Sequence, residues 1–66
     1  MFIKVTAKFS GQTRIPIPDE FTGPCWLVLN GKVLVDPIDY KREGRTFVLD
    51  RMLALQTSDE LIVTDE

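Results

Sequence analysis

The residues that could do chemistry in this chain are few, and their types exclude most catalytic and metal sites. The 66 residues include no histidine and one cysteine. Without histidine, neither a Ser-His-Asp nor a Cys-His arrangement can form, and the clustered Cys and His ligands of a zinc site are also absent. A single cysteine allows no disulfide within the chain. We therefore expect no enzymatic activity, no cofactor and no metal site.

The acidic residues and the cysteine do not change this expectation. Six of the ten acidic residues occur as sequence neighbours, at 19–20, 59–60 and 65–66, and neighbours on a strand point to opposite faces. We interpret them as solvated charges of loops and tail. Cys25 has Lys32 as its nearest downstream basic residue, which favours a small buried hydrophobic side chain over a reactive thiol.

Two groups of residues are candidates for contact with a partner. Lys41, Arg42 and Arg45 surround a predicted hairpin tip, where basic side chains are either simply solvated or bound to an acidic patch on another protein. Most of the aromatic side chains are expected in the core. Phe2 and Trp26 are the two that we expect to reach an interface.

Charge and length restrict the partner. The net charge is −2 and the isoelectric point is near 5.0, so we do not expect nucleic-acid binding. No apolar run approaches the roughly 18 residues of a membrane span, and the first residues do not begin a signal peptide. A domain of this size has a marginal core, which favours a homo-oligomer or many copies bound to an assembly.

The elements that position these residues are nearly all strands. Alternating apolar residues predict a strand over 3–10 and a second over 13–17, joined as a hairpin. Pro16 and Pro18 predict that the second strand lies at a sheet edge. The final strand, over 61–64, is the other candidate edge for pairing with a neighbour.

Two further hairpins follow. Asn30-Gly31, between strands at 26–29 and 32–35, predicts a type I′ turn, and the unbroken apolar run at 26–29 predicts a strand covered on both faces. Gly44 predicts a turn between strands at 38–42 and 45–49. Residues 50–56 are open between a short helical turn and an apolar loop. We predict a single all-β domain over 1–66, a small sandwich or partly open barrel of six to seven short antiparallel strands.

The order of these turns resembles a module that recurs in bacteriophage virion proteins, especially tail fibres and related appendages. The resemblance runs from Phe9 to Val63. It departs from the usual pattern at Ser58, where members tend to have glycine, and at 50–56, where they tend to have a Pro/Ala-rich loop. The matching features are Phe9, Gly11-Gln12-Thr13, Asn30-Gly31, Asp39-Tyr40, Gly44 and Thr46-Phe47.

The resemblance implies a structural role in a virion, made in the host cytoplasm, with other virion proteins as partners. Because the module stands alone in these 66 residues, we expect a capsid cement or decoration subunit, or else a small tail or baseplate adaptor. Such a subunit stabilises an assembly by burying surface at subunit junctions. The alternative is a small SH3-like or OB-like β-barrel regulator or adaptor that binds a host protein or nucleic acid.

Overall fold

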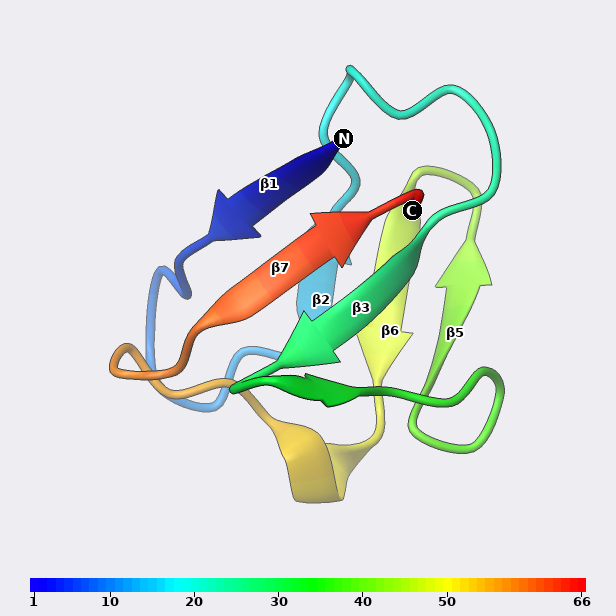
Figure 1. Ribbon diagram of the computed structural model, residues 1–66. Helices are drawn as coiled ribbons and strands as arrows, with labels where there is room; N and C mark the ends of the chain where they lie inside the picture. The colour runs from blue at the N-terminus through cyan, green and yellow to red at the C-terminus, as the bar shows by residue number, and fades with distance from the viewer.

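The computed structural model describes all 66 residues and contains seven strands in two antiparallel sheets (Figure 1). One sheet has the order β1-β7-β3-β4 and the other has the order β2-β6-β5. This confirms the all-β prediction and its strand count. The strands are β1 (Phe2–Val5), β2 (Arg14–Pro16), β3 (Trp26–Leu29), β4 (Lys32–Val33), β5 (Tyr40–Glu43), β6 (Thr46–Leu49) and β7 (Leu61–Thr64).

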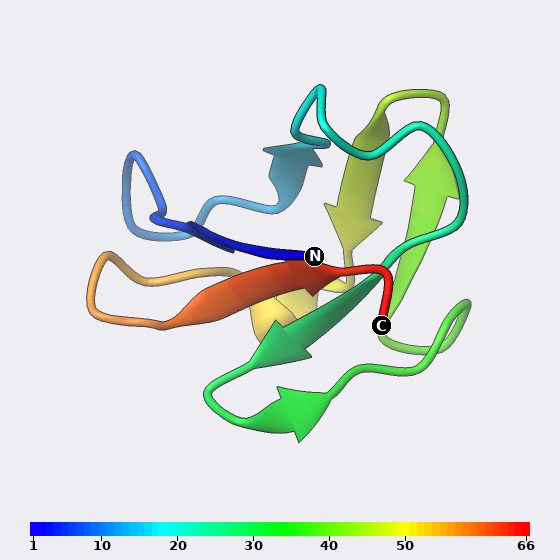
Figure 2. The ribbon, with the colours of Figure 1, turned by 45° about the horizontal axis from the view of Figure 1, so that its top comes forward.

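The two sheets pack face to face around one core, which makes the fold a small sandwich (Figure 2). The four-stranded sheet contributes Leu27, Leu61 and Val63, all fully buried. From the other sheet, Tyr40 and Phe47 meet edge to face with their ring centroids 5.3 Å apart. The complete set of buried hydrophobic residues is Ala7, Ile15, Ile17, Phe21, Leu27, Leu34, Tyr40, Phe47, Leu49, Leu55, Leu61 and Val63.

The predicted turn at Asn30-Gly31 is confirmed. Asn30 and Gly31 have φ values of 50° and 84°, the pair of positive angles that a type I′ turn between β3 and β4 requires. The predicted hairpin at Gly44 also forms, but its two-residue turn is Gly44-Arg45, one residue later than the predicted 43–44, because Glu43 still pairs with Thr46 and Gly44 has the positive φ of 64°. The tight registers of these hairpins follow directly from the turn residues.

The open question at 50–56 resolves to one short 3₁₀ helix, η1 (Arg51–Leu53). Asp50 precedes it with an extended backbone, and its carboxylate accepts a hydrogen bond from Met52 N at 3.1 Å. This side chain satisfies a donor that a helix start otherwise leaves free. Leu55 then enters the core, where it is fully buried.

The predicted hairpin between the first two segments is wrong. β1 ends at Val5 and pairs with β7, whereas β2 pairs with β6 in the other sheet. Between them Gln12 is buried, and its amide accepts from Lys8 N at 2.7 Å and donates to Arg14 O at 2.8 Å. These bonds hold the segment in which the chain crosses from one sheet to the other. The chain crosses here because β1 and β2 cover the core from opposite sides.

Of the two strands predicted to lie at a sheet edge, one does and the other does not. β2, with Pro16, lies at the edge of its sheet as predicted. The prediction that the final strand is an edge is wrong, because β7 lies between β1 and β3. The prediction that residues 26–29 are covered on both faces is also wrong. Leu27 is buried on the core side, whereas no strand or helix covers the other side (Figure 1).

Candidate functional site

The most distinctive surface is the outer side of the four-stranded sheet, which we call the apolar face. It is the side turned away from the three-stranded sheet, and no element of the chain covers it (Figures 1 and 2). Alternation along the strands places every second residue here. Its apolar members on the strands are Phe2, Trp26, Val28, Val33 and Ile62. Val35 follows two residues after Val33, where Leu34 N still donates to Leu27 O at 3.0 Å and so continues the alternation.

The strand register groups these side chains into two rows. Phe2 and Trp26 both pair with Thr64, so they flank it from either side. Val28 pairs with both Ile62 and Val33 in the second row. Side chains on neighbouring strands lie about 5 Å apart. The second row brings Ile62, Val28 and Val33 together across β7, β3 and β4 and ends at Lys4 on β1. In the first row Thr64, which is buried, lies between Phe2 and Trp26.

Exposure confirms that this surface is open to solvent. Phe2 is 69% exposed, Val33 59% and Val35 52%, while Trp26, Val28 and Ile62 are half-buried by their neighbours. Trp26 also contacts the core cluster. A contiguous apolar patch with a polar rim is the surface pattern of a protein-binding site.

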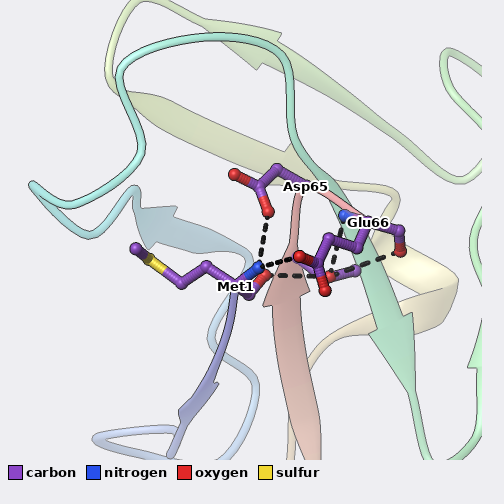
Figure 3. Close-up of polar contacts among 4 residues, drawn as sticks. Met1, Asp65 and Glu66 are labelled. Atoms are coloured by element: carbon purple, nitrogen blue, oxygen red, sulfur yellow. Dashed lines mark hydrogen bonds and ion pairs between the residues drawn. The ribbon is translucent and has the colours of Figure 1, made fainter.

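Charged residues form the rim at both ends of the strands. At one end Lys4 Nζ lies 3.9 Å from Glu60 Oε2. At the other, the Met1 ammonium lies 2.9 Å from Asp65 and 3.0 Å from Glu66 (Figure 3). Hydrogen bonds with these two carboxylates raise the pKa of the ammonium above 8.0. The polar groups of the rim are thus paired with one another, and the apolar side chains between them have no partner.

The two groups of predicted contact residues lie apart. Phe2 and Trp26 come together on the apolar face, whereas Lys41, Arg42 and Arg45 belong to the β5–β6 hairpin of the other sheet. Whether either group binds a partner stays a prediction. The two groups nevertheless differ in their surroundings. Phe2 and Trp26 lie on an exposed side of a sheet, whereas Arg42 and Arg45 donate hydrogen bonds to other residues of the chain.

Arg42 and Arg45 hold the loop that precedes β3. Arg45 donates to the carbonyls of Phe21 and Pro18, the latter at 2.9 Å, and Arg42 Nη1 donates to Gly23 O at 2.8 Å. These contacts fix the loop over the end of the sandwich and help to place Phe21 in the core, where it is 2% exposed. The sequence gives no sign of them, since they join residues about 20 positions apart.

Lys41 is the one member of the basic cluster that forms no hydrogen bond or ion pair in the structure. It lines a shallow, open depression together with residues of η1 and the loop before β5. The two carboxylates there are occupied, because Asp39 accepts from Val35 N at 2.8 Å and Asp50 from Met52 N. The polar side chains of the depression that stay without a partner are the two cations Lys41 and Arg51.

Cys25 is half-buried beside this arginine pair. Arg42 Nη1 lies 3.8 Å from its sulfur, so the nearest basic group comes from a distant strand rather than from Lys32. Burial raises the pKa of the Cys25 thiol above its ordinary value, and the charges of Arg42 and Arg45 lower it by less. A raised pKa disfavours the thiolate, which is the nucleophilic form of cysteine.

The structure has no cluster of three or more His, Cys, Asp or Glu side chains placed to hold a metal ion. None of its helical segments is long and apolar enough to cross a membrane. The chain matches no protein-family model, no curated protein and no solved structure.

Proposed function

We propose that this chain is a non-enzymatic structural subunit of a bacteriophage virion that binds neighbouring virion proteins through its apolar face. The observation that carries the proposal is the exposure of Phe2, Val33 and Val35 on a sheet side that no other part of the chain covers. Large exposed apolar side chains in one patch lower solubility, so their presence is best explained by a partner that buries them.

The virion context rests on the resemblance of the turns and core positions to the phage module. The Asn30-Gly31 and Gly44 turns of that module form in the structure. Within a virion, a capsid cement or decoration subunit is the first assignment and a tail or baseplate adaptor the second. In either place the subunit stabilises the assembly by mass action, because it binds the assembled state and not the separate subunits.

Fractionation of particles tests this proposal. Heads and tails are separated from a lysate of the source, and mass spectrometry measures the 7.5 kDa chain in each fraction. A stoichiometric amount on heads supports a cement subunit, and on tails an adaptor. A chain found only in the soluble fraction contradicts the virion role and supports the small regulator instead.

A matched pair of variants tests the surface itself. Val33→Lys places a charge on the apolar face, and Met52→Lys places the same charge on η1, where Met52 is 89% exposed and away from that face. We expect Val33→Lys to reduce particle binding at least about tenfold, since it buries an unpaired ammonium. Met52→Lys should bind as the wild type does. Equal binding by both variants would show that the apolar face is not the contact.

A further inference from the structure

We propose that two copies of this chain pair through their β1 strands, which joins their four-stranded sheets into one continuous eight-stranded sheet. The pairing is antiparallel and centred on Ile3, so that Phe2 of one copy lies opposite Lys4 of the other. The inference rests on the free edge of β1 and does not depend on the virion role.

The β1 edge is the least protected of the four sheet edges. β2 has three residues and includes Pro16, and β4 has two residues. β5 carries Lys41, Arg42 and Glu43 in succession. Proline, short length and charge are the usual means of blocking edge pairing. β1, with the sequence Phe-Ile-Lys-Val, has four residues and a single charge.

The backbone groups that would pair can be identified from the ladder. Bonded and non-bonded pairs alternate along antiparallel strands, and Asp65 N donates to Met1 O at 3.3 Å. Met1, Ile3 and Val5 therefore turn their backbone groups toward β7. On the other side of β7, Asn30 N donates to Glu60 O at 2.8 Å. The backbone groups of β7 therefore point alternately to β3 and to β1, in agreement with the assignment for Met1, Ile3 and Val5. The N–H and C=O groups of Phe2 and Lys4 consequently point outward from the free edge.

The outward groups and the side chains select the same register. With Ile3 opposite Ile3 of the second copy, Phe2 and Lys4 form bonded pairs, and Met1 lies opposite Val5. Every cross-strand pair then contains an apolar side chain and none joins like charges. Moving the register by two residues in one direction places Lys4 opposite Lys4, which is unfavourable. Moving it in the other direction places Phe2 opposite Phe2 and leaves Lys4 and Val5 of both copies outside the paired residues. A shift by one residue would put core-side and outer side chains on the same face.

Pairing also enlarges the apolar face. A standard interface buries roughly 800 Å² on each partner, which is a large share of the 4324 Å² that the whole chain exposes. Joining two sheets edge to edge leaves both apolar faces open on the same side. A dimer therefore presents about twice the binding area of one copy.

Sedimentation of the purified full chain tests the pairing. We expect a species of about 15 kDa between about 5 and 500 µM. Lys4→Pro removes an outward N–H and the exposed ion pair with Glu60, neither of which joins β1 to β7, so it should fold with an unchanged circular dichroism spectrum and dimerise at least about tenfold more weakly. A wild-type monomer over this range, or a dimer unaffected by a folded Lys4→Pro variant, would overturn the proposal.

Substitution of Phe2 gives a second test that does not involve proline. Phe2→Lys and Phe2→Glu remove the same ring, but only the lysine repels Lys4 of the second copy. We expect the dimer of Phe2→Lys to be about tenfold weaker than that of Phe2→Glu, since the pair occurs twice. Equal dimer affinities of the two variants would contradict the register.

Cross-linking and fluorescence distinguish this pairing from other dimers. In a Cys25→Ser background, Ile3→Cys should form an intermolecular disulfide, because the non-bonded pair brings Cα atoms to about 4.5 Å. Lys4→Cys should not, and cross-linking of Lys4→Cys alone would contradict the register. Trp26, the single tryptophan, lies on β3, two strands from the pairing edge. Its emission should not change on dilution, whereas a dimer joined face to face would expose it.

Discussion

Asn30 and Asp59 tie the tip of the β3–β4 hairpin to the turn before β7. Asn30 Nδ2 donates to Asp59 Oδ1 at 3.1 Å, and Asp59 Oδ2 accepts from Gln56 N at 2.8 Å. In return, Asn30 Oδ1 accepts from Glu60 N at 2.8 Å. Asn30 thus serves two purposes: it adopts the positive φ of the turn, and it positions the chain that enters the central strand β7.

This contact predicts a specific sensitivity to acid. The hydrogen bonds from Gln56 and Asn30 lower the pKa of Asp59 below 3.8. A carboxyl whose folded pKa is depressed contributes stability above its unfolded pKa and loses it as the pH falls through the folded value. We expect thermal melting between about pH 5 and pH 2 to show a smaller acid-induced fall for Asp59→Asn than for the wild type.

A control separates Asp59 from the other carboxylates. Asp19 is an exposed loop residue with no side-chain hydrogen bond in the structure. Asp19→Asn should therefore leave the acid-induced fall in melting temperature close to that of the wild type. If the Asp19 and Asp59 variants respond to acid alike, the Asn30 contact does not contribute to stability.

The Asn30-Gly31 turn predicts different costs for two glycine substitutions. Gly31 has φ 84° and Gly23 has no such angle, while a Cβ added at either position meets no atom within 4 Å. Only the backbone conformation therefore distinguishes the two sites. Gly31→Val should lower the free energy of unfolding by about 1–2 kcal/mol more than Gly23→Val does. Urea denaturation measures both, and equal losses would contradict the turn assignment.

The Arg45 contacts predict that lysine cannot replace this arginine. Its guanidinium donates to Phe21 O and Pro18 O and lies 3.4 Å from Ile17 O, an arrangement that needs a forked donor. Arg45→Lys should lower the free energy of unfolding by about 1–2 kcal/mol in urea denaturation. Arg14→Lys is the matched control, because Arg14 is exposed on β2 and its side chain makes no hydrogen bond in the structure. A similar loss in both would refute the role of the Arg45 fork.

Lys41 tests whether the basic cluster also binds a partner. Because its side chain makes no polar contact in the structure, Lys41→Glu should leave the melting temperature unchanged. Arg45→Glu should lower it, since the loop loses its donors. If the cluster binds an acidic patch, Lys41→Glu weakens particle binding without loss of fold. Unchanged particle binding by Lys41→Glu would restrict the cluster to a structural role.

The sequence predicts those parts of the fold that depend on neighbours in the chain. The turns at Asn30-Gly31 and Gly44 and the strands beside them follow from local backbone chemistry. The position of β7 between β1 and β3 does not, because it depends on contacts between residues about 30 to 60 positions apart. Likewise, the Arg45 contacts to Phe21 and Pro18 require knowledge of which loop closes the end of the sandwich.

The apolar face was partly visible in the sequence. Unbroken apolar residues over 26–29 predict that both sides of a strand are covered, and one side is covered by this chain's own core. On the other side Trp26 and Val28 are only half-buried, and no strand or helix covers that side of the sheet. Phe2 was predicted as an interface residue from its type, but its position in line with Trp26 depends on the pairing of both with Thr64. That pairing depends on how the strands associate in the sheet and does not follow from the residue types alone.

Three consecutive residues allow binding and folding to be separated on the apolar face. Val33 and Val35 lie on that face, while Leu34 between them is 4% exposed in the core. Replacing both valines with threonine should change the free energy of unfolding by less than about 0.5 kcal/mol. Leu34→Ala should lower it by about 2–5 kcal/mol. The double threonine variant should nevertheless lose particle binding, because it removes methyl groups from the surface that the partner buries. If the double variant unfolds as readily as Leu34→Ala, Val33 and Val35 contribute to the stability of the fold. If the double variant still binds particles fully, the apolar face is not the binding surface.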